Sequence, residues 1–197
     1  MLKQIDLNKF NKLSKNVEPE LIAHCFNNET TLSDNTKLVI IGTLTTPNTA
    51  YFYCAYLNRI YGYIDEAVKE KGVFIESLKE LKIGLSKYEK KGIELLPKDE
   101  LDKRVKRIKE ILSEYGIAFL DVMDAAIRRR VSSDDKDIMY YVLAKDNFDQ
   151  IPENATIVAN SKTALDCVNQ IGVKNPIFLS QRSGKKEKWI KTIVDAL

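Results

Sequence analysis

The run LVIIG at residues 38–42 indicates the fold class of this chain. Four apolar residues, three of them β-branched, followed by glycine are typical of a strand that is buried on both faces, as in parallel sheets. The strand leads into a loop over residues 43–58, and a helix is predicted from about 58 to 71. A strand followed by a loop and a helix is the building unit of α/β folds.

Strands and helices alternate along the rest of the chain. Further strands are predicted at 116–123, 155–160 and 175–181, and further helices around 135–144, 161–172 and 185–197. Because such alternation produces parallel strands, we expect an α/β three-layer sandwich with a central, mainly parallel four-stranded sheet flanked by helices. We interpret residues 1–197 as a single domain, with a helical N-terminal segment at about 1–30 and a helical insertion at about 69–110.

The composition is that of an ordinary globular protein. Of the 197 residues, 44% are hydrophobic and 30% are charged, and the net charge is +3. No apolar run reaches the roughly 18 residues that a transmembrane helix needs, and the first residues lack the apolar core of a signal peptide. We therefore expect a cytoplasmic protein with no membrane contact, and a monomer as the default.

Metal-site and cofactor motifs are missing from the sequence. The three cysteines, Cys25, Cys54 and Cys167, are far apart and His24 is the only histidine, which excludes a zinc site of the CxxC type and a His-rich metal centre. No GxGxxG follows the first strand, and GxxxxGKS/T and GxSxG are absent. We expect no metal and no cofactor.

In parallel sheets, functional residues usually lie at the carboxyl ends of the strands. Here those ends precede residues 42–58, 121–133, 160–161 and 180–183. The first of these loops and the start of the helix predicted after it are rich in aromatic residues, with six between 51 and 63. Such rings can stack on a flat ligand such as a nucleobase, or they can pack in the core. The sequence leaves both interpretations open.

The stretch IGTLTTPNTAYFYCAYLNRIYGYI at 41–64 resembles the first motif of the uracil-DNA glycosylase superfamily, most closely in its hypoxanthine-DNA (deoxyinosine) glycosylase branch. Phe52 and Tyr53 match the aromatic pair of that motif, and Asn58 matches its asparagine. Ile60 and Tyr61 stand in place of its Phe-Trp.

Further matches follow in the same order along the chain. They are GIAFLDV at 116–122, Arg128, Ser132, Asp134 and Ile138 in an Arg…Ser-x-Asp…Ile pattern, IVANSKTA at 157–164, IFLSQRSG at 177–184, and Trp189. The chain also departs from the family pattern. Leu44 stands where many branches carry Asp or Asn, and Thr45, Tyr56, Ser180 and Gly184 replace prolines. These changes concern the base pocket and the DNA-contacting loops.

The resemblance implies a monofunctional DNA glycosylase whose partner is DNA. It assigns catalysis to Asn58 and Asp121, and a base pocket to Gly42, Thr43, Leu44, Phe52, Tyr53 and Asn160. It assigns DNA contacts to Ser161, Lys162, Ser180, Gln181, Arg182, Ser183 and Lys185, with basic attraction from Arg128, Arg129, Arg130 and Lys186. No lysine matches a catalytic position, so a Schiff-base step has no nucleophile.

Simpler roles compete with these assignments. Asn58 and Asn160 can cap helices, and Asp121 can bind backbone amides. The excised base is open, with hypoxanthine, uracil or a modified pyrimidine as candidates. Leu44 and Thr45 favour an alternative in which the fold binds nucleic acid or a protein partner without catalysis. A third alternative is an enzyme that acts on free nucleosides or nucleotides.

Overall fold

The structure is a computed structural model, which describes residues 2–16, 22–24, 26–45, 49–55, 58–73, 76–86, 96–130, 134–180 and 184–197. In chain order its elements are β1 (Lys3–Gln4), α1 (Leu7–Ser14), β2 (Ile22–His24), η2 (Asn27–Glu29), β3 (Leu38–Gly42), α2 (Ile60–Glu70), α3 (Leu78–Leu81), α4 (Lys98–Glu114), β4 (Ile117–Asp121), β5 (Met123–Arg128), η3 (Asp135–Asp137), β6 (Ile138–Leu143), α5 (Lys145–Phe148), β7 (Thr156–Ala159), α6 (Lys162–Ile171), β8 (Ile177–Phe178) and α7 (Lys186–Ala196). Among these helices, none is long and apolar enough to cross a membrane.

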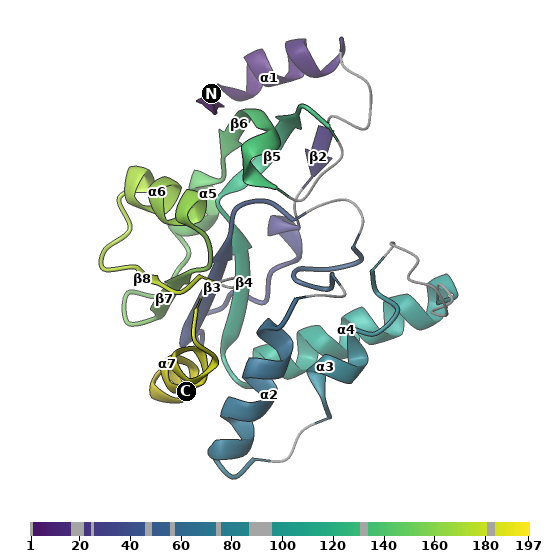
Figure 1. The fold of residues 1–197 in the computed structure, drawn as a ribbon, viewed down its shortest axis with the longest axis vertical. Helices are drawn as coiled ribbons and strands as arrows, with labels where there is room; N and C mark the ends of the chain where they lie inside the picture. Colours follow the sequence, from purple (N-terminus) through teal and green to yellow (C-terminus); the bar gives the residue numbers. More distant parts are fainter. Residues whose placement is uncertain are drawn as a thin grey trace.

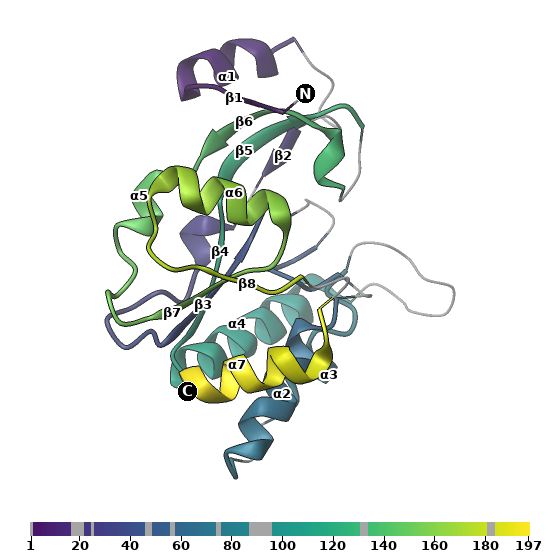
Figure 2. The same cartoon turned by 60° about the vertical axis from the view of Figure 1, so that its left-hand side comes forward.

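A four-stranded, fully parallel sheet forms the centre of the fold. Its strand order is β4-β3-β7-β8, and Ile40 of β3 lies opposite Phe119 on one side and Val158 on the other. The α2, α4 and α7 helices cover one face, and α6 covers the other (Figures 1 and 2). Side chains of β3 alternate between two separate core clusters, as a strand covered on both faces requires. The predicted three-layer α/β sandwich is confirmed.

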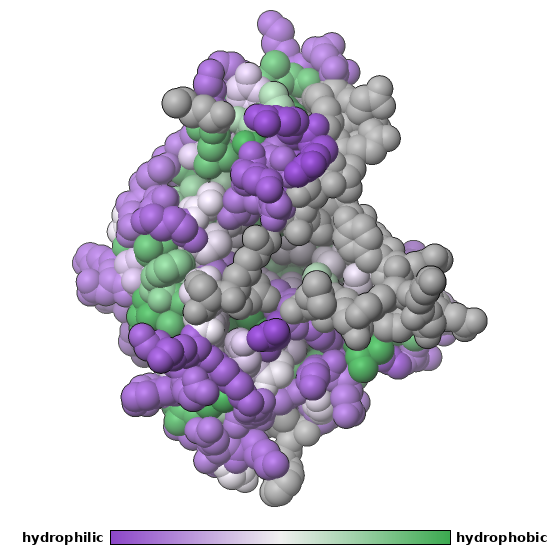
Figure 3. All heavy atoms as spheres, in the orientation of Figure 1, coloured by the Kyte–Doolittle hydropathy of each residue, from purple (hydrophilic) through white to green (hydrophobic). Residues whose placement is uncertain are grey.

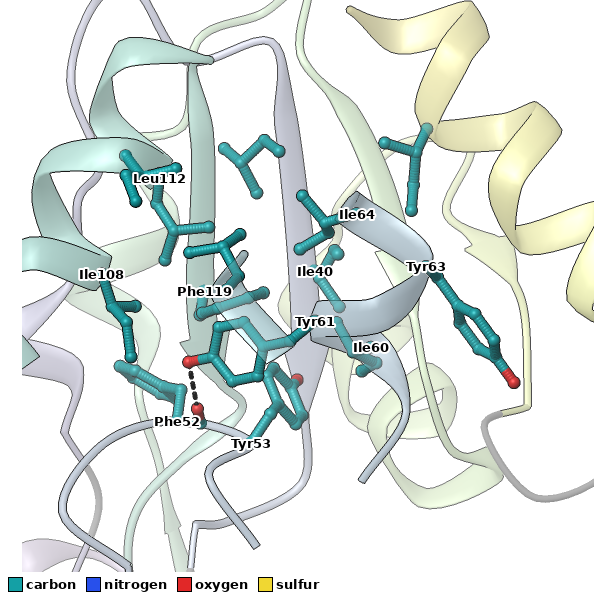
Figure 4. Packing of buried hydrophobic residues seen from close by; sticks show 14 of the residues in the cluster. Ile40, Phe52, Tyr53, Ile60, Tyr61, Tyr63, Ile64, Ile108, Leu112 and Phe119 are labelled. Atoms are coloured by element: carbon teal, nitrogen blue, oxygen red, sulfur yellow. Dashed lines mark hydrogen bonds between the residues drawn. The ribbon is translucent and has the colours of Figure 1, made fainter. Parts of the chain in front are cut away.

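The core on the α2 side is unusually aromatic (Figure 4). Phe119 meets the rings of Tyr53 and Tyr61 edge-on, at centroid distances of 4.8 Å and 5.7 Å. Phe52 is fully buried beside them, and its carbonyl accepts a 2.7 Å hydrogen bond from the Tyr61 hydroxyl. The prediction that Phe52 lines a base pocket is therefore wrong: its ring packs in the core, and only its neighbour Tyr53 reaches a cavity.

A second sheet, which the sequence analysis did not anticipate, stands above the first (Figure 1). Its order is β1-β6-β5-β2, and β6 pairs antiparallel with β5. The helix predicted around 135–144 is wrong, because residues 138–143 form strand β6, which is held by its pairing with β5. The segment at about 1–30 is also not purely helical, since β1 and β2 supply the outer strands of this sheet and α1 is its one α-helix among the described residues.

The two sheets meet at the carboxyl end of β4. Only Val122 separates Asp121, the last residue of β4, from Met123, the first residue of β5. The Val122 amide donates to Gly42 O at 3.0 Å in the first sheet, and the Val122 carbonyl accepts from Ala144 N at 3.0 Å beside the second. The chain thus passes directly from one sheet to the other.

Candidate functional site

A cavity of about 630 Å³ opens at the carboxyl ends of the parallel strands. The outline of the molecule in Figure 3 is indented at mid-height on its right-hand side. Ten residues that the sequence analysis assigned to the site line this cavity: Gly42, Thr43, Leu44, Tyr53, Asn58, Asp121, Asn160, Ser161, Lys162 and Ser180. They come from four separate stretches of the chain, which the parallel sheet brings to one edge.

Asp121 is the most tightly held of these residues. Its side chain is 1% exposed, and Oδ2 accepts a hydrogen bond from the Thr45 amide. The Asn27 side chain fixes the Asp121 backbone, since it donates to the carbonyl at 3.0 Å and accepts from the amide at 2.8 Å. The carboxylate also lies so close to Gly42 that a Cβ there would stand 2.4 Å from Oδ1. Asp121 therefore does bind a backbone amide, and it also reaches the cavity.

Burial raises the pKa of the Asp121 carboxyl from 3.8 to about 6. Hydrogen bonds from Thr45 and the charge of Arg128 act in the opposite direction. Arg128 is 2% exposed and donates to the Leu44 carbonyl at 3.4 Å, so its predicted role in attracting the DNA backbone is wrong. Its guanidinium lies inside the protein, where its charge interacts with Asp135 first and then with Asp121.

Asn58 lies at the cavity and just before α2, whose N-cap residue is Arg59. Its Oδ1 accepts from the Ile60 amide at 3.0 Å, a local turn bond that precedes the helix and is not its N-cap. The same residue lines the cavity, and among the described residues its Nδ2 has no hydrogen-bond partner. The buried Lys82 ammonium donates to the Asn58 carbonyl and to the Ala55 carbonyl, at 3.3 Å for the latter. Asn58 is thus fixed by its backbone and Oδ1, while its amide can donate into the cavity.

Asn160 and Ser161 follow strand β7. Ser161 caps the next helix, whereas Asn160 lines the cavity without capping that helix. The helix cap is Ser161, whose Oγ accepts from Ala164 N at 2.9 Å. Asn160 is 9% exposed, and its side chain lines the cavity. An amide there offers both a donor and an acceptor to a ligand.

Tyr53 has an unusual backbone and an unsatisfied hydroxyl. Its φ of 55° lies in the left-handed region, which is disfavoured for a bulky residue. The side chain is 8% exposed, and the hydroxyl is buried without a hydrogen-bond partner. Burial and the nearby Asp121 raise its pKa, so the hydroxyl keeps its proton and remains a donor. Strain together with an unmet donor at a cavity wall points to a ligand contact.

Only some of the residues predicted to contact DNA line the cavity. Lys162 and Ser180 lie at the cavity, while Lys185 is exposed at the start of α7 and does not line it. Gln181, Arg182 and Ser183 lie outside the described residues, as do Ser132 and Tyr56. The exposed Arg130 pairs with the buried Asp137 at 3.0 Å.

Sequence reasoning missed several residues that line the cavity, chiefly Asp135 and Phe178. Asp135 lies in a run of charges that resembles a solvated turn, so nothing in the pattern pointed to a site. Phe178 is 45% exposed at the cavity, which is unusual for an aromatic residue in a strand. Its place inside IFLSQRSG at 177–184, which resembles a family loop, was the available hint. Among the described residues, no group of three His, Cys, Asp or Glu side chains is arranged to hold a metal ion.

These features define an α/β protein whose pocket lies at the carboxyl ends of a four-stranded parallel sheet. No family model and no curated protein matches the chain. Among solved structures, it is similar to the solution NMR structure of a provisionally assigned uracil DNA glycosylase from Methanosarcina acetivorans. The match covers 89% of this chain and 99% of that chain, with a TM-score of 0.53 and 16% sequence identity. The likeness shows that this chain has a uracil-DNA glycosylase-like fold.

Proposed function

We propose that the protein is a monofunctional DNA glycosylase, which hydrolyses the N-glycosidic bond of a deaminated or otherwise modified base flipped out of DNA. The observation that carries the proposal is the meeting of Asn58, Asp121 and Asn160 at one cavity in a glycosylase-like fold. Base-excising enzymes need such a recess, because the target atom is out of reach inside a stacked helix.

The cavity can supply the three functions that this chemistry needs. Asn160 offers hydrogen bonds to the edge of a base, and Phe178 offers a ring face at the cavity. Asp121 places negative charge where the sugar becomes positively charged as the bond breaks. The Asn58 amide is suited to orient a water molecule against the anomeric carbon.

The proposed step is a hydrolysis. The water oxygen bonds to the anomeric carbon, the bond from that carbon to the base nitrogen breaks, and the base leaves with the electron pair. The proton of the water passes to Asp121, whose raised pKa makes it a better acceptor than an ordinary carboxylate. The departing base then takes up a proton from solvent and Asp121 returns its proton to solvent, so the products are the free base and an abasic site in DNA.

A second candidate function is binding without catalysis. Leu44 lines the cavity at a position where many glycosylases carry Asp or Asn, and its side chain cannot orient water. This single observation favours a protein that uses the pocket to hold nucleic acid or a partner.

The two candidates are separated by base release from synthetic oligonucleotides, single- and double-stranded, that contain uracil, hypoxanthine, xanthine or hydroxymethylated cytosine. We expect wild-type protein to release one class of base and Asn58→Ala to lose that release. Binding of DNA without release of any base would support the second candidate. Release that is equal in both proteins would retain the enzyme and remove Asn58 from its mechanism.

A further inference from the structure

A short chain of hydrogen bonds joins the two sheets across one wall of the cavity. The Thr43 hydroxyl lies 2.8 Å from Asp135 Oδ2 and 2.7 Å from Ser161 Oγ. Ser161 Oγ lies 3.3 Å from the same Asp135 oxygen. Thr43 follows β3 and Ser161 follows β7 in the parallel sheet, while Asp135 belongs to η3 at the edge of the second sheet. All three residues line the cavity.

The protons of this cluster can be counted. Thr43 and Ser161 each have one hydroxyl proton. If Thr43 donates to Asp135, Ser161 donates to Thr43 or to Asp135; if Thr43 donates to Ser161, Ser161 donates to Asp135. Either way both protons are used inside the cluster. Ser161 Oγ also accepts from the Ala164 amide at 2.9 Å, so the acceptor lone pairs left for a ligand at this wall are chiefly those of Asp135 and Thr43.

The lysines near this wall do not change it from an acceptor surface into a donor surface. The Lys136 ammonium pairs with Asp134 at 3.2 Å, and the Lys162 ammonium pairs with Asp166 at 2.9 Å. Both lysine side chains are at least 70% exposed, so they lie at the rim. An independent observation also points to a ligand, since the buried Tyr53 hydroxyl lacks a partner at the same cavity.

We propose that Asp135, held by Thr43 and Ser161, selects a base that carries an exocyclic amino group. This inference deepens the proposed function and rests on it. An amino group brings two hydrogens to one position, and a carboxylate is a suitable partner for such a group on a base. Modified bases of the cytosine or adenine type have it, whereas uracil and hypoxanthine have a carbonyl oxygen there.

Repulsion strengthens the selection. Uracil and hypoxanthine carry a carbonyl oxygen in place of the amino group, and this oxygen would face the Asp135 carboxylate with no hydrogen between them. Discrimination that leaves buried polar groups unpaired is far stronger than discrimination by size. The wall is therefore a specificity element, and Asp135 is its charged member.

The test is a binding competition on the full chain with three sets of two bases related by deamination, which replaces the amine by a carbonyl and adds a proton to the neighbouring ring nitrogen: 5-hydroxymethylcytosine and 5-hydroxymethyluracil, cytosine and uracil, adenine and hypoxanthine. Each base is placed in a labelled single-stranded oligonucleotide with a 2′-fluorinated, hydrolysis-resistant sugar. We expect the amino member of at least one pair to bind about 10-fold or more tightly than its partner. Asp135→Asn adds a donor at nearly the same volume, and we expect it to reduce that preference to below about 3-fold.

Thr43→Val serves as a second variant, because it keeps the shape and removes a hydroxyl; it too should weaken the preference. Asp149→Asn, an exposed carboxylate at the end of α5, is the matched control and should leave the preference unchanged. Equal binding or a carbonyl preference in wild-type protein in every pair would overturn the inference, as would a preference that survives Asp135→Asn. Base release from unmodified sugars is measured beside it, so that an amine preference without release would overturn only the proposed catalysis.

Discussion

The Asp121 carboxylate lies against the backbone of Gly42, with Oδ1 2.4 Å from the point that a Cβ on this glycine would occupy. The contact joins the ends of two neighbouring parallel strands, since Gly42 and Asp121 are register partners. A side chain at position 42 would displace a carboxylate that has almost no room to move. Glycine is therefore required at this position by the site, and not by the dihedral angles of the strand.

We expect Gly42→Ala to lower base release by at least about 10-fold and to destabilise the protein by about 1–3 kcal/mol, as overpacking does. Gly62→Ala is the matched control. Gly62 lies inside α2, and its nearest neighbour would be Lys79 Cδ at 3.6 Å, an ordinary contact. Alanine there should stabilise the helix by about 0.5–1 kcal/mol. Thermal unfolding and release assays on both variants check this prediction, and a Gly42→Ala protein with full activity would contradict it.

The raised pKa of Asp121 predicts that stability and base release change with pH in opposite directions. The folded protein holds this proton up to about pH 6, whereas the unfolded chain releases it near 3.8. Between these values the folded state binds more protons, so the contribution of Asp121 to the free energy of unfolding falls as the pH rises. Base release depends on the deprotonated form, so it should increase through about pH 6.

Asp121→Asn removes the titration and keeps an acceptor for the Thr45 amide. We expect this variant to lose base release and to become more stable relative to wild type as the pH rises from about 4 to 7. Denaturant unfolding at several pH values and single-turnover release rates measure the two effects. A wild-type release rate that is flat across pH 5–7 would exclude Asp121 as the proton acceptor.

The hydrogen bond of Asn58 to the Ile60 amide can be separated from its proposed chemical role. Asn58→Asp keeps an oxygen for the Ile60 amide, so we expect stability within about 0.5 kcal/mol of wild type. It removes the Nδ2 donor, and release should fall by at least about 10-fold. Asn58→Ala should lose both, with a stability cost of about 1 kcal/mol. If Asn58→Asp releases base at the wild-type rate, the amide donor has no part in the reaction.

Tyr53 and Tyr61 form a matched pair of buried tyrosines. Tyr53→Phe removes a hydroxyl that has no partner, so we expect unchanged or higher stability together with weaker binding of the substrate. Tyr61→Phe removes a hydroxyl that donates to the Phe52 carbonyl, and it should destabilise the protein by about 1–2 kcal/mol. Melting temperatures and oligonucleotide affinities compare the two. A large loss of stability in Tyr53→Phe would mean that its hydroxyl serves the fold.

The parallel sheet was predictable because its strands have little ambiguity. Residues 38–42 are all fully or almost fully buried, as a β-branched run ending in glycine requires. The end of α6 was predictable for a similar reason, since Gly172 takes the left-handed conformation, with φ 92°, that commonly ends helices. These are local features, and the physics that fixes them acts within a few residues.

The second sheet, and the different positions of Phe52 and Tyr53, could not be predicted from local sequence. The run IMYYVL at 138–143 can follow a helical or a strand period, and only its pairing with β5 decides between them. Phe52 and Tyr53 have similar rings, and a backbone turn at Tyr53 sends one into the core and leaves the other at the cavity. Asp135 lies at the site because the second sheet packs against the first. No local sequence pattern predicts that packing.

The passage of the chain through Val122 from one sheet into the other means that the cavity is a joint property of both. Thr43 and Ser161 belong to one sheet, and their partner Asp135 belongs to a connection of the other. A ligand that contacts this wall binds only those protein molecules in which the two sheets are packed together. By mass action it stabilises that packed arrangement. Bound nucleic acid should therefore slow amide hydrogen exchange in β5 and β6, strands that are distant in sequence from the loop after β3.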